Sequence, residues 1–207
     1  MTATVNDVHA VLDALADARV GAWLDGGWGV DALLGTQTRV HSDLDLLVDI
    51  ADLPAVPTAL AALGYSLDVD WLPTRAAFAT PAGQRVDLHP VTFDSTGTGW
   101  QAGAAADGAD CPYPAAEFAT GRVGGRTVGC LSARLQLVHH SGYLPRPHDR
   151  ADIFRLAEAF GLALPPAYRR SAPPESGGEH AVQAEQGGAF EPHRLAVDDD
   201  ERDREDG

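Results

Sequence analysis

The stretch that decides the fold is His41-Ser42-Asp43-Leu44-Asp45-Leu46-Leu47-Val48-Asp49. Its apolar run predicts a buried strand over Leu44–Val48, and side chains along a strand alternate between its two faces. Asp43 and Asp45 therefore share one face, opposite to the leucine that follows each of them. Two carboxylates projecting together from a strand end suit a hard divalent cation such as Mg²⁺, which prefers oxygen ligands. Taken alone, the same Asp-x-Asp pattern also fits a solvated strand edge or a turn.

A pair of glycines lies upstream of this strand. Val20–Leu24 is a short apolar run that predicts another buried strand, and Trp28–Leu34 predicts a short helix. Gly26 and Gly27 lie between the two. Glycines at such a place let the backbone approach phosphate groups, and the first N–H groups of a helix are free to bind anions. The alternative interpretation is a plain tight turn.

A third carboxylate lies downstream. Arg85-Val86-Asp87-Leu88-His89 is a second alternating stretch, so Asp87 and His89 share a face. If this strand neighbours Leu44–Val48, Asp87 completes a site for two metal ions, one at the attacking hydroxyl and one at the triphosphate. His89 either contacts the substrate or the scissile phosphate, or simply fills the strand face.

Together these fragments resemble a known family. The segment Trp23–Asp31, then Arg39 and the Asp43-Leu44-Asp45 triplet, resembles the polymerase-beta-like nucleotidyltransferases that inactivate antibiotics. Within that group the chain is most similar to the lincosamide nucleotidyltransferases, with the aminoglycoside 2″-nucleotidyltransferases close behind. The resemblance covers most of Met1–Gly161 and none of the chain after it. It continues through Asp70–Arg75, Val86–Pro90, Cys130–Ser132, Gln136, His140–Tyr143, Asp149 and Asp152.

The resemblance implies a role for each acidic residue of the predicted site. Asp43 and Asp45 would be catalytic residues that bind Mg²⁺. Asp87 would be the third catalytic acid, acting as a metal ligand, as the general base for the acceptor hydroxyl, or as both. His89 would be a substrate-binding residue if its functional interpretation holds.

The resemblance also implies a nucleotide site and a reaction. Gly26 and Gly27 would line the triphosphate site of the co-substrate, ATP or GTP. Arg39 would be a charge partner for phosphate, unless it is an ordinary surface arginine. The expected reaction moves a nucleoside monophosphate onto a hydroxyl of a lincosamide-like antibiotic, and pyrophosphate leaves. Catalysis would come mainly from positioning and charge neutralisation.

Three alternatives share most of these residues. In the first the small-molecule acceptor is an aminoglycoside, and in the second the acceptor is a protein, as for antitoxin-like nucleotidyltransferases. In the third the chain is a non-catalytic nucleotide-binding relative, although a pure binding protein has no need to hold repelling carboxylates together. Related enzymes can form homodimers in which one subunit completes the other's site, and the sequence leaves a homodimer open.

One position departs from the family pattern. The helix after Cys130-Leu131-Ser132 usually carries a glutamate two residues after the serine, and here that position is Arg134. If the glutamate touches the substrate, this charge reversal puts the identity of the acceptor in doubt. If it only packs on the surface, nothing follows from the change.

Several other residues have a structural interpretation that we favour over a functional one. The paired histidines are expected to pack within a helix, and the tryptophans to lie in the core rather than stack on a base or sugar. Asp25 and Asp31 are expected to cap helices or to make structural hydrogen bonds, and Asp149 and Asp152 are expected to cap the last helix rather than to bind metal. These residues are His139, His140, Trp23, Trp28, Trp71, Asp25, Asp31, Asp149 and Asp152.

The remaining patterns predict an α+β fold, a mixed β-sheet flanked by helices, which agrees with the polymerase-beta-like nucleotidyltransferase fold that the resemblance implies. Asn6 is the expected N-cap of a first helix through Leu15. The other expected helices run from Asp52 to Gly64, from Ser132 to Gly142, and from His148 or Asp149 to Phe160. The other expected strands are Tyr65–Trp71, Arg75–Thr80, Arg85–His89 and Val91–Phe93, with a hairpin turn over Pro81–Gln84.

Composition separates the chain into a nucleotidyltransferase domain, residues 1–170, and a disordered acidic tail, residues 171–207. The tail holds eleven acids against three arginines, a net charge of −8, which leaves −7 of the total −15 for the domain. Few apolar residues and dense charge cannot offset chain entropy. An acidic body without lysine is a poor binder of nucleic acid. No apolar run is long enough for a membrane span and no signal peptide is evident, so we expect a soluble, cytoplasmic protein whose two cysteines are free.

Deletion of the residues after Arg170 should therefore leave the domain folded and active, because the tail is expected to bury little apolar surface. The melting temperatures and activities of the full and shortened chains would check this. A large fall in melting temperature would mean that the tail docks on the domain.

Overall fold

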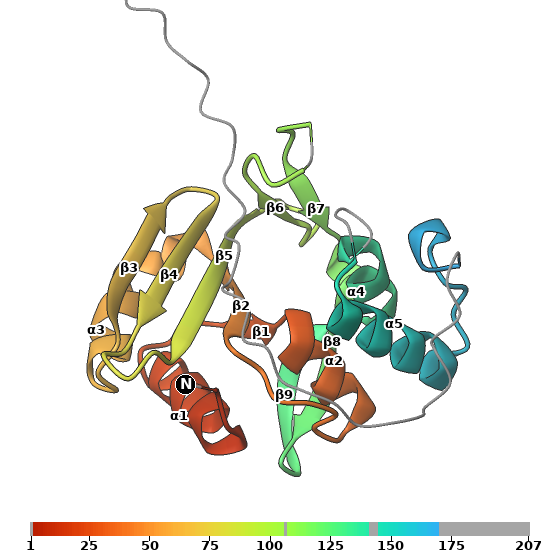
Figure 1. Cartoon of the computed structure of the whole chain (residues 1–207). Coiled ribbons are helices and arrows are strands. Elements are labelled where there is room, and N and C mark those ends of the chain that lie inside the picture. Colours follow the sequence, from red (N-terminus) through yellow and green to blue (C-terminus); the bar gives the residue numbers. More distant parts are fainter. Residues whose placement is uncertain (1, 106, 141–144, 170–207) are drawn as a thin grey trace, which may run out of the picture. The chain divides into compact units, whose positions relative to one another are not determined.

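The computed structural model describes residues 2–105, 107–140 and 145–169 (Figure 1). The chain divides into one unit over Met1–Ala172 and a second over Pro173–Gly207, and the predicted acidic tail lies outside the described residues. The first unit is built on a nine-stranded mixed sheet with the main strand order β3-β4-β5-β2-β1-β9-β8. The expected α+β fold with a mixed sheet is confirmed. The strands are β1 (Ala22–Leu24), β2 (Leu44–Asp49), β3 (Ser66–Trp71), β4 (Arg75–Ala79), β5 (Arg85–Phe93), β6 (Gly99–Gln101), β7 (Cys111–Tyr113), β8 (Phe118–Val123) and β9 (Arg126–Leu131).

The described residues also form α-helices and short 3₁₀ helices. The N-cap of the first helix is Thr4, whose side chain accepts a hydrogen bond from the Asp7 backbone while the Asp7 carboxylate accepts one from the Thr4 backbone. This reciprocal capping starts the helix two residues before the expected Asn6 cap, which is therefore wrong. The α-helices are α1 (Val5–Asp17), α2 (Gly26–Leu34), α3 (Val56–Ala61), α4 (Ala133–His139) and α5 (Pro147–Phe160), and the 3₁₀ helices are η1 (Ile50–Ala55), η2 (Ala115–Glu117) and η3 (Pro166–Tyr168).

The helix expected from Asp52 and the strand expected over Val91–Phe93 are arranged differently in the structure. The helix expected from Asp52 divides into η1, which contains Pro54, and α3. The strand expected over Val91–Phe93 is not separate, because β5 runs straight through Pro90. The ladder between β5 and β4 ends at Leu88, so the missing N–H of Pro90 removes no bond to β4.

The strands after β5 were not expected from the sequence. β6 and β7 extend from β5 as a short side ribbon, and β8 and β9 form a hairpin that places β9 parallel to β1. The hairpin turns through Gly124 and Gly125, both with positive φ, and paired glycines between strands are a recognised hairpin signal. The strands themselves are short and interrupted by glycine or proline, so they carry little alternating pattern.

The two faces of β2 explain why its acids are accessible. Leu44, Leu46 and Val48 are buried in the main core, together with apolar residues of α1, α3 and β5. Leu47 faces a separate cluster with residues of β5, β7, β9 and α4. Asp45 shares the face of Leu47 and lies beyond its apolar cover.

No helix in the described ranges is long and apolar enough to cross a membrane. Cys111 and Cys130 are free, as expected.

Gly121 of β8 gives a test of this arrangement. A Cβ built there would overlap the backbone carbonyl of Ala32 in α2. Gly121→Ala should therefore force α2 away from the sheet and cost roughly 1–3 kcal/mol of unfolding free energy. Chemical denaturation would measure the loss. Thr120→Ala, at an exposed position of the same strand, is the matched control, and equal losses in both variants would contradict the packing described here.

Candidate active site

The sheet brings the predicted acids together. β2 and β5 are parallel neighbours, and Asp45 lies directly opposite Asp87 in their register. Asp43 precedes β2 by one residue and lies close enough for the charges of Asp45 and Asp87 to affect it. Burial, followed by those two negative charges, raises the pKa of Asp43 above its usual value. Three acids from two separate stretches of sequence therefore form one electronegative site.

Asp87 is the most enclosed of the three and is held by two arginines. Its side chain accepts from Arg75 Nη2 at 2.8 Å on one oxygen and from Arg85 Nε at 3.2 Å on the other. Only 5% of the residue is exposed. In the described part of the chain no three His, Cys, Asp or Glu side chains are grouped so that they could hold one metal ion. A role for Asp87 as a metal ligand therefore stays a prediction.

The glycine turn lies against the Asp45 carboxylate. Asp25 is the N-cap of α2 and accepts from the Gly26 backbone at 2.7 Å, so the helix starts earlier than the expected Trp28. The Asp25 backbone N–H in turn donates to the Asp45 carbonyl at 3.0 Å. Gly26 has φ +55°, and a Cβ there would lie 2.5 Å from Asp45 Oδ2. Gly26 thus allows the helix N-terminus to approach the carboxylate closely.

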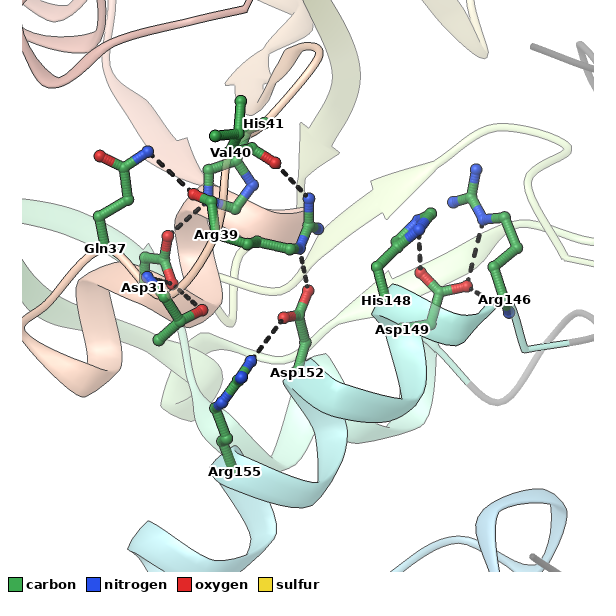
Figure 2. A network of polar contacts seen from close by, with 11 residues as sticks. Asp31, Gln37, Arg39, Val40, His41, Arg146, His148, Asp149, Asp152 and Arg155 are labelled. Carbon is green, nitrogen blue, oxygen red and sulfur yellow. Dashed lines mark hydrogen bonds and ion pairs between the residues drawn. The ribbon is translucent and has the colours of Figure 1, made fainter. Parts of the chain in front are cut away.

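Arg39 reaches the same turn from the loop that follows α2. A Cβ at Gly27 would meet Arg39 Nη2 at 2.5 Å and the His41 ring as well. Arg39 Nε donates to Asp152 Oδ2 at 2.8 Å, so Asp152 makes an ion pair instead of the expected helix cap (Figure 2). Asp149 does act as a cap, because its carboxylate accepts from the Arg146 backbone at 2.9 Å.

His89 lies beside Asp45, and its second ring nitrogen contacts Gln101. Its Nε2 is 3.4 Å from Asp45 Oδ1, and its Nδ1 is 3.2 Å from Gln101 Nε2. Gln101 also accepts from the Tyr113 hydroxyl at 2.7 Å. Although burial opposes a charge on the ring, the hydrogen bond and charge of Asp45 raise the pKa of His89. Gln101 and Tyr113 come from β6 and β7, and sequence reasoning missed both residues.

His139 does more than pack within its helix. Its Nδ1 lies 3.8 Å from Asp25 Oδ2, and its Nε2 lies 3.9 Å from Cys111 Sγ. Burial opposes the charge on both groups, but their mutual attraction raises the pKa of His139 to about 9 and lowers that of Asp25 to about 2. The expectation for His140 is confirmed, since this residue is buried and its Nδ1 lies 2.8 Å from the Gln136 carbonyl.

The prediction that the tryptophans lie in the core holds for Trp23 and Trp28 but not for Trp71. Trp23 packs against Phe93 and Phe118, and Trp28 is buried beside His41, as expected for core residues. Trp71 is 40% exposed. The Arg75 guanidinium lies 5.4 Å from the centre of the Trp71 ring, so the core interpretation of Trp71 is wrong.

Arg134, the residue that departs from the family pattern, lies on the surface. The side chain of Arg134 is 78% exposed, and its Nε lies 3.4 Å from Glu117 Oε1. Glu117 also accepts a hydrogen bond from the hydroxyl of Ser132, the N-cap of α4. Arg134 therefore screens a carboxylate at a helix start and has no contact with the acids of the candidate site.

The profile of the aminoglycoside-2″-adenylyltransferase family matches residues 7–156, a range that contains the acids and the glycine turn just described. The chain belongs to this family. Its members transfer nucleotidyl groups, so the chain is a nucleotidyltransferase. A lincosamide resistance protein of Staphylococcus haemolyticus is 33% identical over 153 residues, which cover 74% of this chain and 94% of that protein.

Solved structures agree with this assignment. The lincomycin-bound crystal structure of the lincosamide antibiotic adenylyltransferase LnuA has a TM-score of 0.67 and 32% identity, and the match covers 75% of this chain and 98% of that one. The solution structure of the antibiotic-resistance factor ANT(2″)-Ia, at 22% identity and a TM-score of 0.59, supports the fold alone. The match covers 76% of this chain and 84% of that one.

The Asp25–His139 pair predicts a pH dependence of stability. Because folding raises the pKa of His139 from 6.5 to about 9, its stabilisation is complete below 6.5 and is lost as pH rises through 9. The lowered pKa of Asp25 adds stability that is lost only as pH falls through about 2. His139→Gln should therefore lower the unfolding free energy most between about pH 4 and 6.5 and progressively less above it. Denaturant titrations across pH would measure this, and a constant difference from pH 6 to 10 would contradict the ion pair.

Proposed function

We propose that this nucleotidyltransferase moves a nucleoside monophosphate from ATP or GTP onto a hydroxyl of a lincosamide-like antibiotic and releases pyrophosphate. The observation that carries the proposal is the register of β2 and β5, which sets Asp45 beside Asp87, with the Gly26 turn against Asp45. The similarity to a lincosamide resistance protein and to LnuA over nearly their whole length supports the acceptor class.

Asp43 and Asp45 are the residues that would hold Mg²⁺. Burial and the charges of Asp45 and Asp87 raise the pKa of Asp43, and a bound cation would relieve that repulsion. Two carboxylates also fit the usual magnesium site, which is completed by water and by substrate phosphates. When bound, the metal supplies charge neutralisation at the phosphates and a more acidic acceptor hydroxyl.

The protein's own groups have separable tasks in this proposal. The backbone at Gly26 and Gly27 binds the triphosphate at the N-terminus of α2. Asp87, oriented by Arg75 and Arg85, accepts the proton of the acceptor hydroxyl. The hydroxyl oxygen then forms a bond to the α-phosphorus while the bond to the β-phosphate oxygen breaks, and pyrophosphate leaves with the electron pair. His89 would contact the substrate beside Asp45.

An aminoglycoside is the second candidate acceptor. The family description names aminoglycosides, and a 2″-aminoglycoside nucleotidyltransferase of Escherichia coli is 29% identical over 136 residues. That match covers 63% of this chain and 69% of the relative, compared with the longer match to the lincosamide resistance protein. The lincosamide proposal is therefore the stronger of the two.

Pyrophosphate release tests the proposal directly. The chain, Mg²⁺ and ATP or GTP would be incubated with lincomycin, clindamycin and several aminoglycosides in turn. We expect release with the lincosamides. Release with aminoglycosides alone would select the second candidate, and no release with any member of the panel would contradict both acceptor classes.

Asp45→Asn should lower turnover by at least about two orders of magnitude, because a metal ligand contributes several kcal/mol of transition-state stabilisation. Asp49→Asn is the matched control: it lies on the same strand, and its carboxylate caps η1 through the Ala51 N–H at 2.9 Å. The control should retain its activity. Turnover near that of the unaltered chain in the Asp45 variant would remove Asp45 from the mechanism.

A further inference from the structure

The loop from Gly35 to Asp43 carries two basic side chains onto the glycine turn. Arg39 Nη2 and the His41 ring both lie where a side chain of Gly27 would otherwise be. The loop leads directly into Asp43 and β2. The position of these two side chains therefore affects both the start of α2 and the first of the three acids.

Each of the two basic groups is held by a buried aspartate. His41 Nε2 is hydrogen-bonded to Asp31 of α2, and both side chains are almost completely buried. Arg39 Nε donates at 2.8 Å to Asp152, which comes from α5 and lies 113 residues further along the chain. Figure 2 shows Asp31 and Asp152 reaching the loop from their two helices.

Arg39 is the main positively charged partner of the Asp152 carboxylate. Only 1% of its side chain is exposed, compared with 26% for Arg39. The nearest nitrogen of Arg155 lies 3.8 Å from Asp152 Oδ1, which is too long for a good hydrogen bond, and this oxygen has no hydrogen-bond partner among the described residues. A buried carboxylate that loses its main partner is strongly destabilising. The ion pair with Asp152 therefore also fixes the position of the Arg39 side chain.

The hydrogen bonds of Arg39 leave one end of its guanidinium available. Nε is bound to Asp152, and Nη1 donates to the Val40 carbonyl at 3.2 Å. No acceptor for Nη2 lies among the residues that the structure describes, and this is the nitrogen that lies against Gly27. A planar guanidinium held at two of its nitrogens points the third in a defined direction. That direction is the turn at the N-terminus of α2.

We propose that Asp152 is a positioning residue of the nucleotide site and acts through Arg39, whose free Nη2 binds a phosphate oxygen of the triphosphate. This inference rests on the proposed function, since it places a triphosphate at the Gly26–Gly27 turn. An arginine that is already ordered loses less conformational entropy when a phosphate binds. The helix α5 thereby contributes to nucleotide affinity without touching the nucleotide.

The experiment is a double-mutant cycle on nucleotide binding, measured by calorimetry with ATP and Mg²⁺ and no acceptor. We expect Arg39→Gln to raise the dissociation constant by about tenfold, as for loss of a charge-assisted hydrogen bond. Asp152→Asn should raise it by about three- to tenfold. The double variant should bind no more weakly than Arg39→Gln alone, because the two residues act as one unit.

Three further variants separate positioning from a purely structural role. Arg155→Gln is the matched control, because it removes the other arginine near Asp152 and should leave nucleotide affinity unchanged. Arg39→Lys keeps the charge but loses the Nε bond, so it should weaken binding nearly as much as Arg39→Gln. This variant also tests the inference if Asp152→Asn does not fold. Asp152→Glu should restore part of the affinity.

The inference is overturned if Asp152→Asn lowers the melting temperature but binds ATP as the unaltered chain does. It is equally overturned if Arg39→Gln or Arg39→Lys keeps full affinity, or if the two substitutions weaken binding additively. The proposed function fails separately. Affinities that change as expected, together with no transfer to any antibiotic of the panel, would contradict the acceptor and support the role of Asp152.

Discussion

The parallel pairing of β2 with β5 is the constraint on which the rest of the site depends. Its register aligns Asp45 with Asp87 on one face and aligns Leu44 and Leu46 with Val86 and Leu88 in the buried core. Carboxylates held this close repel one another, so the site opposes folding. The apolar burial on the other face of the same two strands supplies the free energy that keeps them together.

Basic groups around the site offset much of this negative charge. Two arginines hold Asp87, a histidine lies beside Asp45, and the His139 imidazolium pairs with Asp25 at the start of α2. Asp43 is the least compensated of the three acids, since burial and the charges of Asp45 and Asp87 raise its pKa more than Ser42 and Arg39 lower it. Negative charge is therefore least compensated at the entry to β2, where Asp43 and Asp45 are proposed to hold the cation.

A second set of contacts ties the surrounding helices to that turn. His41 is bonded to Asp31 within the segment from α2 to β2, whereas Arg39 is bonded to α5 through Asp152 (Figure 2). Both aspartates are almost completely buried, and a buried carboxylate is costly to leave without its partner. The loop that enters β2 is thus fixed from two directions, which favours a preorganised site over one assembled on binding.

The sequence by itself determined the local parts of this site. Alternation along a strand predicted that Asp43 and Asp45 share one face, and the order of strand, Gly26-Gly27 and helix predicted a helix N-terminus at this site. The later strands carried no comparable signal, because strands of three residues, or strands broken by glycine, have too few alternating positions to stand out. Only the tertiary structure decided which distant residues meet, as when Asp152 reaches Arg39 across 113 residues. Such a pairing depends on how helices pack on the sheet, and no local pattern of one chain records that.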